Sequence, residues 1–331
     1  MSRIRKLFWF DKKSSEEMIS FLNDKAADKY INHIMFNPFI FLHHLLPLKL
    51  KFLPESYILE NDKKAKGLIT VASTTGKEKK VKIQKLLFEE GSFLEASELI
   101  QFVTAKYKAL GAFSITVKVD DYLPELLTML VSKCNFSQIS YEKLWKIDKF
   151  INKEFDKQDF RVFRNSDARA LVNAYNNSIL PHFRPLLSAD VSDFKENTFK
   201  GLSYYSEYKY IYENQKKTNP ITGIIIKTYD NENFIIDIIQ PLGAEIDIDT
   251  IISYTTYQIK KRKKRFALFV RTKRYTQLGE QQEQYFLKEG FECVQNQTLL
   301  TNTSAKILKE EIKSGKYTII GDFCPSKIMP V

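Results

Sequence analysis

Apolar and polar residues follow regular spacings through most of the chain, and the order of these spacings occurs twice. Alternating apolar and polar residues predict a strand at 113–119, and a short apolar run predicts another at 266–270. Each strand follows a predicted amphipathic helix, at 95–110 and at 249–263, and precedes a second helix, at 123–133 and at 279–289. Their inward positions recur at helical spacing: Leu99, Val103 and Leu110 in one helix, and Ile251, Ile252 and Ile259 in the other.

The repeat is also visible in the residues themselves. Residues 57–64 read YILENDKK and residues 210–217 read YIYENQKK, which are six identities in eight at an offset of 153. The same offset relates Phe113 to Phe266, and it drifts to 155 between Phe136 and Phe291. A nearly constant offset over a whole unit indicates a duplicated domain rather than a solenoid of short repeats.

The predicted organisation is therefore two mixed α/β domains in tandem, at 1–150 and 158–331, with a C-terminal extension from about 303. A charged stretch at 148–158 separates them. Within each unit the order is a strand hairpin, a helix, a strand, a helix and a strand. The apolar runs that follow the repeated segment begin at Gly67 and Gly223, so we expect these two glycines to superpose.

Composition narrows the class of protein without changing this organisation. The 331 residues are 44% hydrophobic and 27% charged, typical of a globular protein, and the net charge is +11. The most apolar stretch, 39–50, is too short and too interrupted to span a bilayer, and 1–10 lacks a signal-peptide core, so we expect a cytoplasmic protein. Cys134, Cys293 and Cys324 have no partner at metal-ligand spacing, which predicts reduced thiols and no metal site.

The element order and its glycines resemble the GNAT N-acetyltransferase superfamily. Gly223 and Gly290-Phe291 match the family pattern in the second unit, Gly67 and Asn135-Phe136 match it in the first, and residues 160–168 resemble the family's opening strand and helix start. The resemblance implies two mixed sheets of about six strands, each flanked by helices. It also implies transfer of an acyl group from acyl-CoA, such as acetyl-CoA, to an amine on a small molecule or peptide.

The resemblance places a cofactor loop before the first helix of each pair, where the family has Arg/Gln-x-x-Gly-x-Gly/Ala. The first unit reads FEEGSFLEA at 88–96, and the second reads PLGAEIDID at 241–249, each with three carboxylates. Carboxylates satisfy the free N–H groups of a helix start, but they repel a pyrophosphate. We therefore expect acetyl-CoA to bind weakly or not at all at either helix start. The positions that the resemblance assigns to the cofactor are Ile239, Pro241, Gly243 and Ala244 in this loop, and Arg271, Lys273 and Arg274 beside the cleft.

Candidate acid and base residues are few. The family often places a general-acid tyrosine five residues before the Phe of Gly-Phe, where this chain has Phe286 and Val131. Tyr285, one residue away, is the candidate acid. His182 is a candidate base or anion contact, or else a polar loop residue, and His43 with His44 is the possible equivalent in the first unit.

Two further features leave alternatives open. Tyr208, Tyr210 and Tyr212 share one face of a predicted strand, which suits either stacking on a ligand or core packing. Six consecutive cations suit either a helix cap or contact with RNA or another polyanion: Lys260, Lys261, Arg262, Lys263, Lys264 and Arg265.

The leading hypothesis is an acyltransferase with its active half in the second unit, which keeps Pro241, Gly290-Phe291, His182 and the cations at 271–274. An aminoacyl-tRNA-dependent transferase of Fem type is the alternative enzyme. A binding or scaffold protein made of two degenerate domains is the non-catalytic alternative.

Overall fold

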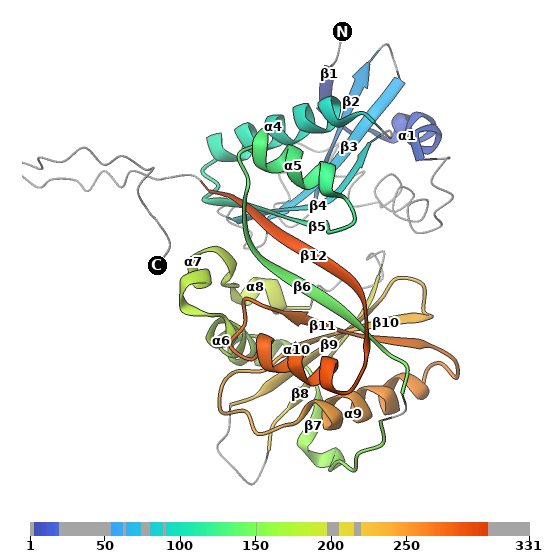
Figure 1. The fold of residues 1–331 in the computed structure, drawn as a ribbon, viewed down its shortest axis with the longest axis vertical. Helices are drawn as coiled ribbons and strands as arrows, with labels where there is room; N and C mark the ends of the chain where they lie inside the picture. The colour runs from blue at the N-terminus through green and yellow to red at the C-terminus, as the bar shows by residue number, and fades with distance from the viewer. Residues whose placement is uncertain are drawn as a thin grey trace, which may run out of the picture.

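The computed structural model describes residues 3–19, 54–61, 64–73, 80–88, 91–149, 151–196, 205–214 and 220–303. His43, His44, the apolar stretch at 39–50, Cys324 and the extension beyond 303 lie outside the described residues. The described residues form one mixed sheet with helices on both faces (Figure 1).

The sheet is continuous through both units and has twelve described strands in the order β1-β2-β3-β4-β5-β12-β6-β11-β10-β9-β8-β7. Those of the first unit are β1 (Arg3–Lys6), β2 (Glu55–Asn61), β3 (Lys64–Ser73), β4 (Lys80–Phe88), β5 (Ser114–Asp120) and β6 (Ser137–Ile147). Those of the second are β7 (Phe160–Val162), β8 (Ser206–Tyr212), β9 (Thr222–Thr228), β10 (Asn233–Ile239), β11 (Ala267–Lys273) and β12 (Glu292–Thr303).

The last strand of each unit lies in the half of the sheet that the other unit builds. β12 pairs antiparallel with β5, β6 pairs antiparallel with β11, and the two exchanged strands pair with each other along most of their length (Figure 1). The mixed α/β class and about six strands per unit are as expected, but the two expected sheets are fused into one. β6 and β12 have similar lengths, 11 and 12 residues, and each ends its own unit, so the exchange is reciprocal.

Helices cover both faces of the sheet. On one face lie α4 (Phe93–Ala109) and α5 (Pro124–Ser132) of the first unit, and α9 (Ile248–Lys260) and α10 (Gly279–Lys288) of the second. The other described helices are α1 (Lys12–Ile19), α6 (Ala168–Ser178), α7 (Arg184–Leu187) and α8 (Val191–Phe194), with α6 on the opposite face. No described helix is long and apolar enough to cross a membrane.

Alternation along the strands decides which face a side chain occupies. Ile224 and Ile226 of β9 pack in the α9 core, whereas Ile225 packs with α6. Each exchanged strand completes the core of its host unit: Leu300 of β12 is buried against α4 and α5, and Trp145 of β6 stacks on Phe286 of α10.

The structure confirms the duplication. The parallel pairs β4 with β5 and β10 with β11 begin at Lys80 opposite Ser114 and at Asn233 opposite Ala267, which is an offset of 153 on both strands. After the last helix of each unit, Asn135 (φ 55°) and Gly290 (φ 72°) both adopt the left-handed conformation that ends a helix. Asn135 therefore adopts, in the first unit, the left-handed conformation that Gly290 adopts in the second.

The expected superposition of Gly67 and Gly223 is wrong by one position. Tyr57 pairs with Ile69 and Tyr210 pairs with Ile224, so Gly223 corresponds to the residue after Gly67 and lies on the opposite face. A Cβ on Gly67 would lie 2.6 Å from Leu99 of α4, and one on Gly223 would lie 2.3 Å from Leu171 of α6. Each glycine therefore allows a different helix to pack closely against the sheet, α4 at Gly67 and α6 at Gly223.

The exchange predicts that neither unit is stable alone. A fragment of residues 1–150 lacks β12 and leaves the β5 edge unpaired, and a fragment of 151–331 lacks β6 and Trp145. Each should be insoluble or self-associated when expressed alone, because an open edge and an incomplete core favour association. Co-expression should give a soluble 1:1 complex by size-exclusion chromatography. A single fragment that is monomeric and unfolds cooperatively would contradict this.

Candidate functional site

In each unit two neighbouring parallel strands separate part of the way along. β10 and β11 pair only from Asn233–Ala267 to Asp237–Arg271, although β10 continues to Ile239. β4 and β5 pair over three residues, ending at Lys82 opposite Thr116. Beyond these points the facing backbone N–H and C=O groups have no strand partner among the described residues and are open to solvent, side chains or a ligand.

Charged side chains gather where β10 and β11 separate. Asp237 of β10 is buried and lies 3.0 Å from the Lys273 ammonium and 3.5 Å from the Arg271 guanidinium. Arg271 also lies 3.7 Å from Glu142 on the exchanged strand β6. Glu142 is 1% exposed, accepts a 2.6 Å hydrogen bond from Lys118 of β5, and accepts another from the Tyr275 hydroxyl at 2.8 Å.

These contacts fix the protonation of both carboxylates. Burial by itself raises the pKa of Glu142, but the positive charges of Lys118, Arg271 and Lys273 outweigh it and lower the pKa to about 2. The pKa of Asp237 is likewise lowered well below its usual value, against burial, by Lys273 and Arg271. Both groups are carboxylates at neutral pH and too weakly basic to take a proton from an amine.

Two amide groups of the predicted cofactor loop of the second unit donate hydrogen bonds within the loop. The Ala244 N–H donates to the Pro241 carbonyl and the Ile246 N–H donates to the Ala244 carbonyl. Asp247 caps α9 by accepting from the Thr250 N–H at 2.9 Å, and Lys153 lies 2.9 Å from its carboxylate. These residues fit a pyrophosphate cradle poorly, since two of the loop N–H donors are engaged and a carboxylate occupies the helix start.

The other predicted cofactor positions are placed as follows. Ile239 is buried with α6, Pro241 is buried, and Gly243 is exposed at φ +83°. The cations of the set are already paired with the protein's own carboxylates: Arg271 and Lys273 with Asp237, and Arg274 with Glu280 of α10 at 3.0 Å. The structure brings Arg271 and Lys273 together at the strand separation and directs Arg274 toward α10.

The two candidate catalytic residues lie on different faces of the sheet. Tyr285 of α10 donates its hydroxyl hydrogen bond to Asp249 of α9. Burial and this bond raise the pKa of Tyr285, which makes its phenol a weaker acid. His182 is exposed in the turn at 181–183, which follows α6 on the opposite face, and its ring lies 4.0 Å from that of Phe183.

The cation run and the tyrosine face are joined by one contact, between Arg262 and Tyr208. Tyr210 and Tyr212 are buried in the core of the second unit. Arg262 lies over the Tyr208 ring at 4.3 Å and donates to the Gln258 carbonyl at the end of α9, while Lys261 lies 4.1 Å from the Tyr257 ring. The tyrosines are packing residues, Arg262 caps a helix, and contact of the run with RNA stays a prediction.

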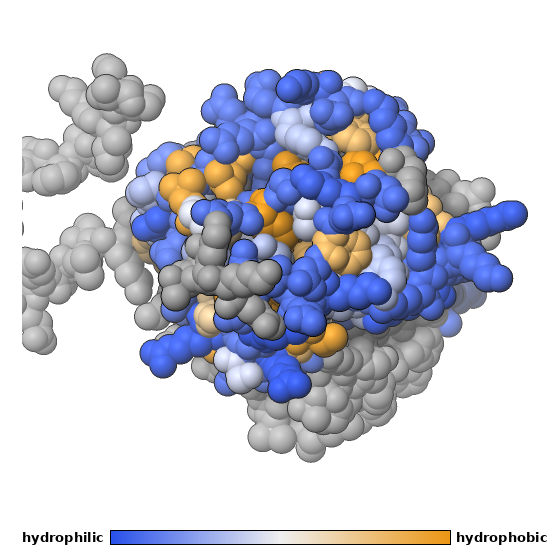
Figure 2. Space-filling view, turned by 90° about the horizontal axis from the view of Figure 1, so that it is seen from below, coloured by the Kyte–Doolittle hydropathy of each residue, from blue (hydrophilic) through white to orange (hydrophobic). Residues whose placement is uncertain are grey.

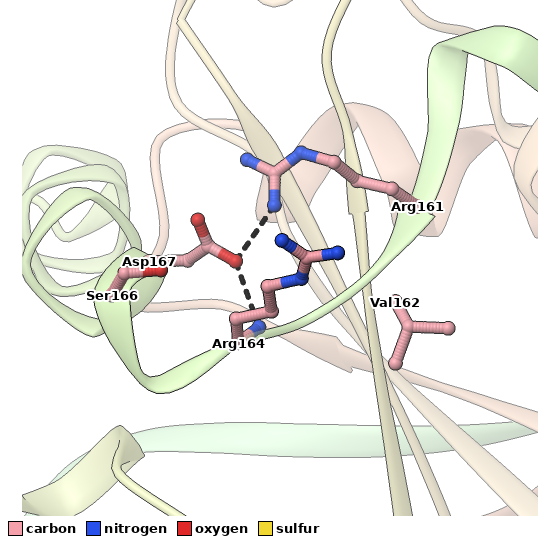
Figure 3. A pocket seen from close by; sticks show the side chains of 5 residues that line it. All are labelled: Arg161, Val162, Arg164, Ser166 and Asp167. Atoms are coloured by element: carbon pink, nitrogen blue, oxygen red, sulfur yellow. Dashed lines mark hydrogen bonds and ion pairs between the residues drawn. The ribbon is translucent and has the colours of Figure 1, made fainter.

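A cavity of about 470 Å³ opens beside the start of α6 and is lined by Arg161, Val162, Arg164, Ser166 and Asp167 (Figure 3). The Asp167 carboxylate accepts hydrogen bonds from Arg161 at 2.7 Å and from the Arg164 backbone N–H at 2.8 Å. The main polar groups that line this cavity therefore bind one another at the turn before α6. Figure 2 shows hydrophilic residues over most of the end of the molecule seen from below, with separate hydrophobic patches. A second cavity, of about 580 Å³, is lined by residues of β6 with Leu180, Phe183 and Arg274.

Several residues of this region were not predicted from the sequence, among them Glu142, Asp237, Lys118 and Lys82. Asp237 carries a usable signal, because it is the only charge in the apolar run at 234–239. Glu142 and Lys118 stand in strands where polar residues alternate, so nothing marks them before the sheet is assembled. Among the described residues, no group of three or more His, Cys, Asp or Glu is placed to hold a metal ion.

No family model matches the chain, and no curated protein matches it. Among solved structures it resembles a tandem GNAT protein from the clavulanic acid biosynthesis pathway, with a TM-score of 0.61 at 8% identity, covering 92% of this chain and 98% of that one. It also resembles a GCN5-related N-acetyltransferase from Sphaerobacter thermophilus (TM-score 0.58, 8% identity, 91% and 95% covered). A putative acetyltransferase from Pyrococcus horikoshii gives 0.53 at 9% identity, with 92% and 89% covered. The chain therefore has the fold of tandem GNAT proteins.

The lowered pKa of Glu142 predicts an acid-dependent contribution to stability. Its stabilising effect is complete above the ordinary glutamate pKa of 4.5 and is lost as pH falls toward about 2. Replacing Glu142 by Gln should lower the free energy of unfolding at neutral pH by roughly 3 kcal/mol and flatten the stability curve over that acid range.

Urea unfolding at several pH values measures this effect. Glu292→Gln, at an exposed position on β12, is the matched control and should change stability by less than about 0.5 kcal/mol. Equal effects of the two substitutions would show that the contacts of Glu142 contribute nothing particular.

Proposed function

We propose that the protein is an N-acyltransferase whose transfer site lies where β10 and β11 separate in the second unit. The observation that supports it is the end of parallel pairing at Asp237 and Arg271, beside a buried network of two carboxylates and three cations. The open backbone edge of β10 offers N–H and C=O groups that an extended, amide-containing acyl donor can pair with. The fold of solved tandem GNAT proteins is consistent with this chemistry.

The donor we propose is an acyl thioester such as acyl-CoA, held chiefly by its amide-containing arm. In the 241–247 loop the Ala244 and Ile246 amides are engaged and the Asp247 carboxylate occupies the helix start, so the nucleotide half of acetyl-CoA should add little affinity. The acceptor is an amine on a small molecule or peptide, and we place the reaction in the cytoplasm. The ion pairs of Arg271 and Lys273 with Asp237 hold β10 and β11 together at the point where the two strands separate.

Release of free thiol in the presence of a panel of amines tests the proposal, with acetyl-CoA and acetyl-pantetheine as parallel donors. At least one amine should stimulate release from both donors, with kcat/KM values that agree within about tenfold. Arg271→Gln should lower the rate by at least about tenfold. Lys146→Gln, at an exposed position on β6, should leave it within about twofold.

Two outcomes would contradict this proposal. If no amine stimulates thiol release from either donor, the non-catalytic scaffold is the better hypothesis. If acetyl-CoA is preferred by more than about a hundredfold, the loop holds the pyrophosphate after all.

The substitution Tyr285→Phe tests whether Tyr285 is a catalytic acid or only a contact between α10 and α9. Loss of a general acid costs about a hundredfold or more in kcat. Because the Tyr285 hydroxyl is bound to Asp249 and its pKa is raised, we expect kcat to stay within about threefold of the parent. The unfolding free energy should fall by about 1 kcal/mol through loss of the hydrogen bond. A hundredfold fall in kcat with unchanged thermal stability would establish Tyr285 as the acid.

A further inference from the structure

A row of charged side chains crosses the face of the sheet opposite α4, α5, α9 and α10. Alternation places it there: Val117 and Val119 of β5 pack against α4 and α5, so Lys118 points to the other face, and the same holds for Asp237 between Ile236 and Ile238. The row runs over six strands of both units: Lys82 on β4, Lys118 on β5, Glu142 on β6, Arg271 and Lys273 on β11, Asp237 on β10 and Lys227 on β9.

Cations outnumber carboxylates in this row. Glu142 forms ion pairs with Lys118 and Arg271. Asp237 forms ion pairs with Lys273 at 3.0 Å, Arg271 at 3.5 Å and Lys227 at 3.9 Å. A third carboxylate, Glu207, lies 3.5 Å from Lys227 but is closer to Lys209, at 2.8 Å. Among the described residues the row therefore carries an excess of positive charge.

Within the described part of the chain, Lys82 is the cation of the row that has no partner. It is half-buried, and it has no hydrogen bond or ion pair with any described residue. The positive charge of Lys118, together with burial, lowers the pKa of Lys82 to about 7. Glu142 opposes this shift, while Lys227 and Arg271 add to it. The neighbouring cation on the same face of β4, Lys80, is bound to Ser188 and lies near Asp190 and Asp193 of the α8 segment.

The side chains remain accessible to a small solute. The exposed fractions are 21% for Lys118, 20% for Arg271, 14% for Lys273 and 28% for Lys227. Half-buried cations held close together repel one another, and an oxyanion between them both removes the repulsion and accepts charge-assisted hydrogen bonds.

We propose that this face binds the oxyanion of a small ligand, a carboxylate or phosphate group, between Lys82, Lys118 and Arg271. The site lies between the two units and belongs to neither alone, because Lys82 and Lys118 come from the first and Arg271 from the second. It is separate from the 241–247 loop, where carboxylates occupy the helix start. The inference does not depend on acyl transfer.

Isothermal titration of the full-length protein with inorganic phosphate and with malonate, at constant ionic strength, tests the site. Binding of either anion supports it, and the arm that binds identifies the ligand as a phosphate or a carboxylate. A bound oxyanion stabilises the protonated form of Lys82, so affinity should fall by at least about tenfold between about pH 6 and about pH 9. Failure of both anions to bind at the acid end would overturn the proposal.

Lys82→Gln should weaken binding at the acid end by at least about tenfold and remove most of the pH dependence. The substitution leaves no carboxylate unpaired, because Lys82 has no described partner. Lys133→Gln, at an exposed position at the end of α5, changes the net charge equally and should leave affinity within about twofold.

Equal binding by the Lys82 variant and the parent would overturn the site, as would equal weakening by the two variants. If Lys82→Gln does not fold, the parent protein still decides, since an affinity that does not change with pH contradicts the role of Lys82.

Discussion

The antiparallel pairing of β6 with β12 is the constraint on which the rest of the molecule depends. Because these strands are exchanged, β5 meets a strand of the second unit and β11 meets a strand of the first. Glu142 stands directly opposite Gln297 in this pairing, and their other neighbours, Lys273 and Asp120, are related by the repeat offset of 153. A pseudo-twofold axis therefore passes between Glu142 and Gln297, normal to the sheet. It keeps the paired helices of both units on one face.

The order of elements could be predicted from the sequence because each unit carries its own local signals. Helical spacing predicted the helices at 95–110 and 249–263. The turn residues Asn135 and Gly290 marked the end of the last helix in each unit. The exchange could not be predicted, since β6 and β12 hold equivalent places at the ends of the two units and no local signal determines which unit each will join. The one-residue shift between Gly67 and Gly223 could not be predicted either, because both registers place a glycine near the start of an apolar strand.

The candidate site was predictable only in part, and for a related reason. Arg271 and Lys273 were identified by their place on a strand, and the structure places both beside Asp237. Of their partners, Asp237 comes from β10 of the same unit, whereas Glu142 comes from β6, which becomes a neighbour of β11 only through the exchange. The carboxylates of the 241–249 segment were visible at once, because a helix start is a local feature. The structure adds that the amide groups of Ala244 and Ile246 are already engaged.

The excess positive charge of the sheet face follows from the symmetry and from one departure from it. The repeat offset relates Lys118 to Arg271, so the axis generates two cations at equivalent places. It does not generate two carboxylates, since the counterpart of Glu142 is the neutral Gln297, whose amide donates to Asp120 at 2.9 Å. One carboxylate at the axis must therefore serve both cations, and Lys118 remains close enough to Lys82 to lower its pKa. A glutamate in place of Gln297 would add one carboxylate at the axis and reduce this excess. The amide at this position leaves the imbalance that an anionic ligand can neutralise.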